Sequence, residues 1–351
     1  MAQGCDVVEI LTLHVFMRYL CTNWTFAEVQ CKGETMCRWM ARALPLFLSI
    51  VITISQTALG AEKEEPIHVA ILMAGCMTEH DRIWLKYFEE HPLVSSGKIM
   101  TRTFVGDGNP DSIVNLMEVI ELGDYDAVIA TSDSRHFGHM IAERMADAGI
   151  PLWGTSLMAT DKLNGYVGPD DLEAGYLTAK AIFSTFADGG RVVVLKGSPD
   201  SMVTEAREAG LRKALAEHPE IEILEEANAN WSETEAFSQM DRWLTYYLDR
   251  KIDGVIAQND DMAIGALNAI RSASVPLLPV VGVDGIPEAV EAVENSELFL
   301  TLRRDAQVEA FAILKMILEH FGSSHRGDTS DMTKLVVPWK IITASDMYTQ
   351  K

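Results

Sequence analysis

Short apolar runs alternate with stretches of helical period along most of the chain, and this alternation restricts its fold more than any other feature. The apolar runs predict strands at 68–74, 99–105, 127–130, 151–154, 191–195, 221–225, 254–257 and 279–283. Between them, the helical period predicts helices at 82–90, 112–122, 136–148, 172–186, 203–217, 233–249 and 307–321. Strands separated by helices of this length form β-α-β units, so we expect an α/β fold with parallel sheets.

The number of these units is too large for one sheet, which predicts two Rossmann-like lobes. We place the N-terminal lobe at 62–169 plus 305–333 and the C-terminal lobe at 170–304 plus 334–351. The segment 155–169 is rich in Gly, Asn and Thr, and we expect it to carry the chain from one lobe to the other.

Polar side chains follow two of the predicted strands directly. The stretch 252–270 reads IDGVIAQNDDMAIGALNAI and has a shorter parallel in VVGVDGI at 280–286. In open α/β sheets, ligands bind at the carboxyl ends of the strands, where Asn and Asp offer fixed donors and acceptors to hydroxyl groups. Polar residues at strand ends are more often helix N-caps than ligand contacts, but two such stretches in one chain favour a binding site.

Charge and motif content exclude several classes of function. The net charge of −22 argues against binding to nucleic acid or anionic lipid. The sequence has no G-x-G-x-x-G, Walker, GxSxG or HExxH motif, and no CxxC metal pair. We therefore expect no enzyme, with no catalytic residues, no metal site and no cofactor.

The first part of the chain has the pattern of an export signal. A short basic segment around Arg38 and Arg42 precedes an apolar run from Ala43 to Leu59, and the small residues Gly60 and Ala61 follow. This order is typical of a cleavable signal peptide at 36–61, although an uncleaved membrane anchor remains an alternative. We interpret residues 1–35, which precede this signal, as an extension from an early start codon that is not part of the native fold.

Five segments, in order, match the pattern of one protein family. They are IHVAILMAG at 67–75, YVGPDDLEAG at 166–175, AREAGLRKAL at 206–215, AQNDDMAIGALNAI at 257–270 and VVGVDGIPEAV at 280–290. The chain resembles the type 1 periplasmic sugar-binding proteins of ABC importers, the ribose/galactose-binding group. This resemblance implies two lobes joined by three crossings, a ligand cleft between them, a periplasmic monomer and a membrane ABC permease as partner.

The resemblance also implies ligand-binding residues in the second lobe. Arg207 falls on the position of an arginine that binds sugar hydroxyls, and Asn259 and Asp284 fall on an amide and a carboxylate. Trp231 falls where the family has an aromatic that stacks on the sugar ring, and Arg304 where the family often has Gln. From the residues alone, Arg207 could instead be a surface cation and Trp231 a core aromatic.

The first lobe departs from the family pattern. His80 and Asp81 stand in place of paired aromatics, and Ser156 aligns where many members carry Asp. With Asp171 as a further contact, we expect a pocket rich in acceptors that favours a neutral sugar or polyol over an anion. A His80 contact would also make the affinity fall below about pH 6.5.

Two other functions use the same fold. A periplasmic sensor could present its bound ligand to a membrane kinase or chemoreceptor, and nothing in the sequence separates this role from transport. A transcription regulator would need a basic helix-turn-helix before the first strand, and here the predicted signal peptide holds that place.

Overall fold

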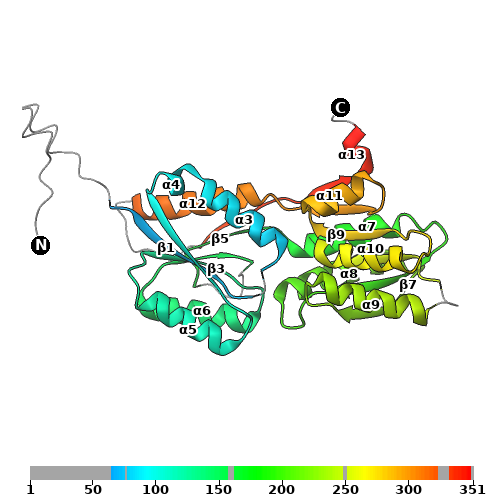
Figure 1. Cartoon of the computed structure of the whole chain (residues 1–351), viewed down its shortest axis with the longest axis horizontal. Helices are drawn as coiled ribbons and strands as arrows, with labels where there is room; N and C mark the ends of the chain where they lie inside the picture. Colours follow the sequence, from blue (N-terminus) through cyan, green and yellow to red (C-terminus); the bar gives the residue numbers. More distant parts are fainter. Residues whose placement is uncertain (1–64, 76, 157–161, 248–250, 323–331, 349–351) are drawn as a thin grey trace, which may run out of the picture. The chain divides into compact units, whose positions relative to one another are not determined.

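The computed structural model describes residues 65–75, 77–156, 162–247, 251–322 and 332–348. The elements of these residues form two α/β lobes, each built on a six-stranded sheet (Figure 1). No helix within the described part of the chain combines the length and the apolar character needed to cross a membrane. The predicted signal peptide at 36–61 and the extension at 1–35 lie outside the described residues.

The first lobe has a sheet of six parallel strands in the order β11-β5-β4-β3-β1-β2. The strands are β1 (Ile67–Met73), β2 (Ile99–Val105), β3 (Ala127–Thr131), β4 (Leu152–Thr155), β5 (Gly165–Gly168) and β11 (Thr333–Val336). One face packs on α3 (Glu79–Glu90), α4 (Pro92–Ser95) and α12 (Ala306–Gly322). The other face packs on α5 (Pro110–Glu121) and α6 (Arg135–Ala148).

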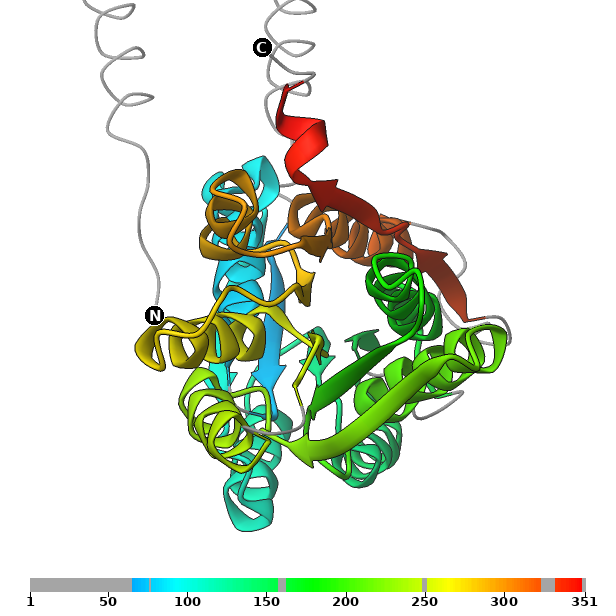
Figure 2. The ribbon, with the colours of Figure 1, turned by 90° about the vertical axis from the view of Figure 1, so that its right-hand side faces the viewer.

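The second lobe repeats this architecture, with the strand order β12-β10-β9-β8-β6-β7 and only β12 antiparallel among the paired strands described. Its strands are β6 (Gly190–Lys196), β7 (Ile221–Asn228), β8 (Gly254–Ala257), β9 (Val280–Asp284), β10 (Leu300–Arg303) and β12 (Lys340–Thr343). Its helices are α7 (Asp171–Phe183), α8 (Met202–Glu217), α9 (Glu233–Tyr246), α10 (Asp260–Ser272), α11 (Pro287–Glu294) and α13 (Ala344–Tyr348). In Figure 2 this lobe faces the viewer, with helices on both sides of its sheet.

Alternating side chains of each central strand supply the two cores of a lobe. On β6, Val193 and Leu195 pack towards α9 and α10, whereas Val192 and Val194 pack towards α7 and α8, and all four are fully buried. A strand covered on both faces is apolar at consecutive positions, since neighbouring side chains point to opposite faces. This explains the continuous apolar runs of the sequence.

The predicted two-lobed α/β fold is confirmed, although four short strands were not expected. These are β5, β10, β11 and β12, and β5 lies inside the segment 155–169 that was expected to be a crossing. The expected lobe boundary between 333 and 334 falls inside β11, which pairs with β5 in the first sheet. The other expected lobe boundaries remain proposals.

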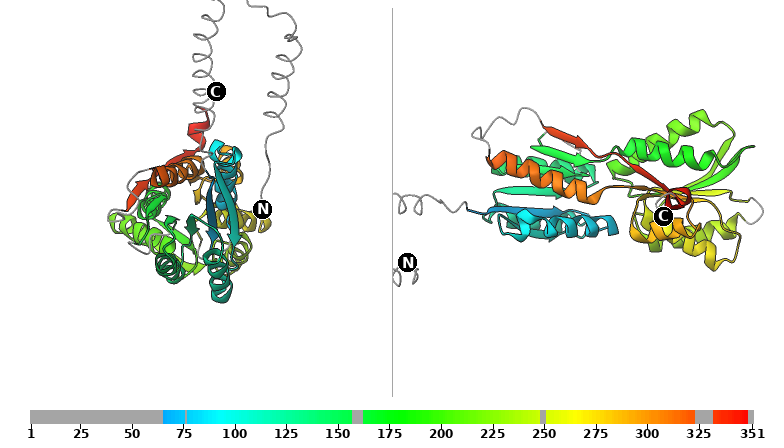
Figure 3. Two further views of the ribbon diagram at one scale, coloured as in Figure 1. Left: turned by 90° about the vertical axis from the view of Figure 1, so that its left-hand side faces the viewer. Right: turned by 90° about the horizontal axis from the view of Figure 1, so that it is seen from above.

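Three connections join the two lobes within the described residues. They run from β5 to α7, from β10 to α12 and from β11 to β12 (Figure 3). Each connection begins at the carboxyl end of a strand, β5 and β11 in the first sheet and β10 in the second, so the carboxyl ends of both sheets lie close to the crossings. This arrangement places the residues that follow the strands in a common region.

Candidate functional site

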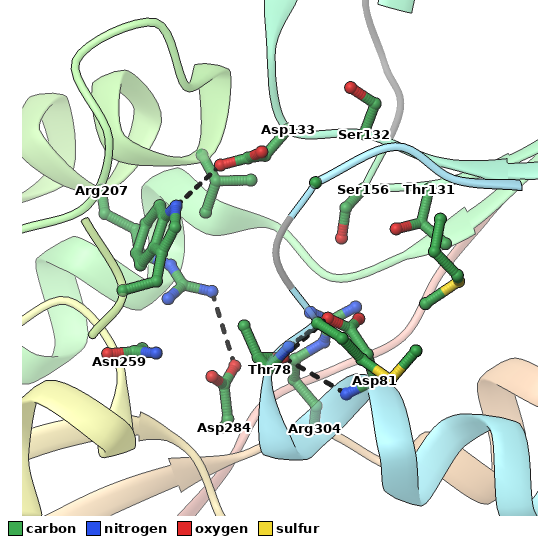
Figure 4. A pocket seen from close by; sticks show the side chains of 15 residues that line it. Thr78, Asp81, Thr131, Ser132, Asp133, Ser156, Arg207, Asn259, Asp284 and Arg304 are labelled. Carbon is green, nitrogen blue, oxygen red and sulfur yellow. Dashed lines mark hydrogen bonds and ion pairs between the residues drawn. The ribbon is translucent and has the colours of Figure 1, made fainter. Parts of the chain in front are cut away.

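A cavity of about 620 Å³, including its opening to solvent, lies between residues of both lobes (Figure 4). Most of its lining residues end or follow strands, as the rule for open α/β sheets predicts. From the first lobe it is lined by Met73, Gly75, Met77, Thr78, Asp81, Thr131, Ser132, Asp133 and Ser156. From the second lobe it is lined by Val203, Arg207, Trp231, Asn259 and Asp284, and Arg304 follows β10 at a crossing.

Arg207 is the central cation of this cavity and is only 3% exposed. Its Nε donates to Asp171 Oδ1 at 2.9 Å, and its Nη1 donates to the backbone oxygen of Gln258. The guanidinium also lies near two indoles, with Cζ 5.8 Å from the Trp231 ring centroid and 5.6 Å from that of Trp339. A buried arginine held by a carboxylate, a carbonyl and two aromatic faces is fixed in orientation.

Asp284 faces Arg207 across the cavity, with 3.8 Å between Oδ1 and Nη2 (Figure 4). Its backbone has φ of 122°, a conformation that favours glycine and costs a non-glycine residue about 1–3 kcal/mol. Burial raises the pKa of the Asp284 carboxyl group, and the positive charge of Arg207 acts against this rise. The chain therefore holds a strained, buried carboxyl group at the cavity wall.

Asn259 lines the cavity and also begins a helix. Its Oδ1 accepts from Met262 N at 3.0 Å as the N-cap of α10, and its Nδ2 donates to Asp261 Oδ2 at 3.2 Å. The capping alternative is thus correct for this residue, and the cap fixes the side chain at the edge of the cavity.

Trp231 reaches the cavity from a loop with φ values of 51° at Asn230 and 63° at Trp231. Its indole lies against Gly197, where an added Cβ would come within 2.0 Å of the ring. The indole N–H donates to Asp133 Oδ2 of the first lobe at 2.8 Å. The Trp231 side chain is half-buried, packs against the edge of the second-lobe core and lines the cavity.

The loop after β3 contacts the second lobe directly. Met202 N donates to the backbone oxygen of Asp133 at 2.8 Å, and Arg135 N donates to that of Asp200 at 3.2 Å. Together with the bond between Trp231 and Asp133, these contacts join the two lobes beside the cavity. They describe a closed arrangement around the site.

Arg304 is held by Glu309 of α12, with Nη2 to Oε2 at 3.0 Å and Nε to Oε1 at 3.2 Å. Burial alone would raise the pKa of Glu309, but Arg304 and His80 outweigh it and lower that pKa. His80 Nε2 lies 3.6 Å from Glu309 Oε2, and the ring is buried. His80 therefore lies beside Glu309 and is not among the residues that line the cavity, in contrast to the expectation from the sequence.

Some of the remaining predicted residues line the cavity, and others do not. Asp81 lines the cavity, but its carboxylate also accepts from Thr78 N at 2.9 Å and from Thr78 Oγ1 at 2.8 Å, which closes the capping box of α3. Ser156 lines the cavity with φ of 53°. Asp171 does not line it, because its carboxylate is directed to Arg207. Trp84, one turn after His80 on α3, is buried against Phe88 in the first-lobe core.

Most of the first-lobe lining was not predicted from the sequence. Thr131 is the last residue of β3, and Ser132 and Asp133 follow this strand as Asn259 follows β8, so the rule for strand ends could have found them. The apolar members Met73, Met77 and Val203 carry no comparable signal, because apolar residues at strand ends and in helices usually belong to the core.

Residues 97–323 match the family model described as periplasmic binding protein domain. The xylitol-binding protein of Mycolicibacterium smegmatis is 35% identical over 165 residues, which are 47% of each chain, so the match spans about half the length of that relative. The D-apiose import binding protein of Paraburkholderia graminis is 25% identical over 248 residues, or 70% of this chain and 78% of that one.

Solved structures show the same fold. A periplasmic solute binding protein of an ABC transporter from Actinobacillus succinogenes, with bound D-allose, has a TM-score of 0.69 and 27% identity, and the match covers 81% of this chain and 99% of that one. The Caulobacter myo-inositol binding protein has a TM-score of 0.73 at 20% identity, with 81% and 95% covered. The match to the family model extends over more than half of the sequence, and the chain belongs to the periplasmic binding protein domain family.

Proposed function

We propose that the chain is the substrate-binding protein of an ABC importer and that it holds a neutral monosaccharide or polyol in the cavity between its lobes. The relatives named above bind xylitol, D-apiose and D-allose, which are small molecules with many hydroxyl groups. The cavity offers the carboxyl groups of Asp133 and Asp284, the amide of Asn259 and the hydroxyl of Ser132 to such a ligand.

The observation that carries the proposal is the pairing of both cavity arginines with carboxylates of the protein. Arg207 is paired with Asp171, and Arg304 is paired with Glu309. The carboxylates of Asp81, Asp133 and Asp284 line the same cavity, so its positive charge is more than balanced. An anionic ligand would meet no net attraction here, whereas hydroxyl groups would find both donors and acceptors.

Trp231 supplies the apolar surface that a sugar or polyol needs besides its hydrogen bonds. Its ring lines the second-lobe side of the cavity, and Met73 and Met77 line the first-lobe side. The C–H groups of a sugar or an extended polyol would lie between these surfaces. We infer no chemical step, so the ligand is expected to be released unchanged.

A thermal-shift screen tests the ligand class, because a ligand that binds only the folded state must raise the melting temperature. We expect a shift with at least one of xylitol, D-apiose, D-allose, D-ribose and myo-inositol. Sugar phosphates and aldonic acids are expected to give none. A panel in which only the anions stabilise the chain would contradict the proposal.

Transport and export are tested in cells. A strain without the gene should lose uptake of the ligand, and loss of a ligand-induced response with uptake intact would favour the sensor alternative. The monomeric chain should be recovered from the periplasm with its start near Glu62, after cleavage near Ala61. Recovery of the uncleaved chain in the cytoplasm would contradict export.

A further inference from the structure

Asp260 is a fully buried carboxyl group that lies outside the cavity. It is the first residue of α10, directly after Asn259, and it is 0% exposed. It does not line the cavity, so the proposed function gives it no contact with the ligand. A buried polar group of this kind needs hydrogen-bond partners, and its partners indicate what it does.

The partners of Asp260 all belong to the turn that follows Asp284 or to the neighbouring strand. Its Oδ2 accepts from Gly285 N at 2.6 Å and from Ile286 N at 3.0 Å. Thr301 Oγ1 lies 2.7 Å from Oδ1, and it also accepts from Gly285 N at 3.2 Å. One carboxyl group and one hydroxyl group therefore hold the two backbone N–H groups directly after Asp284.

These two N–H groups belong to a turn that needs external support. Asp284 has φ of 122° and Gly285 has φ of 71°. Ile286 is the N-cap residue of α11, but its side chain makes no capping bond. Asp260, from α10, accepts from the N–H of this N-cap residue, which is the role that a Glu or Gln side chain at N3 has in a capping box.

The sheet makes room for this carboxyl group. Gly282 lies on β9 beside Asp260, and a Cβ added there would come within 2.2 Å of Asp260 Oδ1. Any other residue at this position would displace the carboxyl group from the turn. The glycine in the VVGVDGI segment therefore serves the contact between α10 and the turn.

We propose that Asp260 is a positioning residue, which holds the Asp284–Gly285–Ile286 turn through two backbone N–H groups and thereby places the Asp284 carboxyl group in the cavity. The inference rests on the proposed function only for its effect on ligand affinity. Its structural part, the conformation of Asp284, holds for the chain without ligand.

The test compares Asp260→Ala with Asp260→Asn. The alanine variant loses the acceptor, so we expect φ of Asp284 to leave the region near 122° in its crystal structure and the affinity to fall at least tenfold. The asparagine variant keeps a carbonyl oxygen for both N–H groups and an NH₂ group for Thr301, so it should stay within about threefold of the wild type. Calorimetric titration with xylitol, D-apiose or D-allose, whichever the wild type binds, measures the affinities.

A thermodynamic cycle separates positioning from general stability. If Asp260 acts through Asp284, then Asp260→Ala should weaken binding much less in an Asp284→Ala background than in the wild type. Equal effects in both backgrounds, or an unchanged Asp284 conformation in Asp260→Ala, would overturn the inference.

A second substitution covers the case in which Asp260→Ala does not fold. Thr301→Val removes the hydroxyl group that contacts both Asp260 and Gly285, and it should weaken binding about threefold or more. Thr178→Val is its matched control, because Thr178 is equally buried but bonds only within α7. Unchanged affinity in Thr301→Val would also overturn the inference, whereas a wild-type chain that binds no sugar or polyol would overturn the proposed function instead.

Discussion

The indole N–H of Trp231 donates a hydrogen bond of 2.8 Å to Oδ2 of Asp133, and this bond joins a loop of the second lobe to a strand end of the first. Both residues line the cavity, and Trp231 also covers one side of the Arg207 guanidinium. The bond can form only while the two lobes are close together. Trp231 therefore links the apolar surface of the proposed site to the closed arrangement of the lobes.

Trp231→Phe tests this link, because phenylalanine keeps an aromatic face but cannot donate to Asp133. A hydrogen bond to a charged group contributes about 1.5–3 kcal/mol, so we expect the affinity to fall about tenfold or more. Trp243→Phe is the control, since Trp243 is buried in the second-lobe core and its Nε1 has no hydrogen-bond partner among the described residues. Equal affinities of the two variants in calorimetric titration would contradict the link.

We expect Asp284 to increase the ligand affinity while it lowers the free energy of unfolding. Glycine at this position relieves about 1–3 kcal/mol of backbone strain, which exceeds its entropic cost of about 0.5–1 kcal/mol relative to alanine. We therefore expect Asp284→Gly to be more stable than Asp284→Ala by about 1 kcal/mol in urea unfolding, while both variants lose at least tenfold in affinity. A more stable alanine variant would show that φ of 122° carries no strain.

The pH dependence of stability should reveal Asp260 and Asp261. Burial and the nearby Asp284 charge raise the pKa of Asp260 to about 8 and that of Asp261 to about 6. Both values exceed the unfolded value of about 3.9. The contribution of these two groups to the free energy of unfolding is therefore fully present below about pH 4 and is lost as the pH rises through the folded-state values. These two groups should therefore lower the free energy of unfolding between about pH 4 and pH 8.

Asp260→Asn cannot ionise at residue 260, so its free energy of unfolding should decline less than that of the wild type. The decline that remains in the variant comes from Asp261 and should occur mostly below about pH 6. Urea unfolding at one-unit steps from pH 4 to pH 8 measures both curves. Parallel curves for the variant and the wild type would contradict the assignment of the raised pKa to Asp260.

The sequence predicted the fold wherever a single segment carried its own signal. The strand β8 and the start of α9 were predicted with their observed bounds, because an apolar run and a helical period are local patterns. The strands β5 and β10 have only four residues each, and β5 contains two glycines, so neither stands out from a loop. Their strand conformation depends on pairing with distant neighbours, which a single segment does not reveal.

The same distinction between local signals and distant neighbours applies to the residues of the candidate site. Arg207, Trp231, Asn259, Asp284 and Arg304 were predicted through the family resemblance, and all five line the cavity. His80 and Asp171 are not among the lining residues, and the sequence could not indicate this because the neighbours of a helical side chain depend on the packing of the helix. For these two residues the neighbours are Glu309 and Arg207. Asp133 could have been found as a residue that follows a strand, but its bond to Trp231, 98 residues away in the chain, has no local signal.

The most direct measurement is calorimetric titration of the mature chain with a neutral polyol or sugar and with the corresponding aldonic acid. Because Asp171 and Glu309 neutralise the two cavity arginines, the neutral ligand should bind and the acid should bind at least tenfold more weakly. Tighter binding of the acid, or no binding of any neutral sugar or polyol, would contradict the assignment of the cavity.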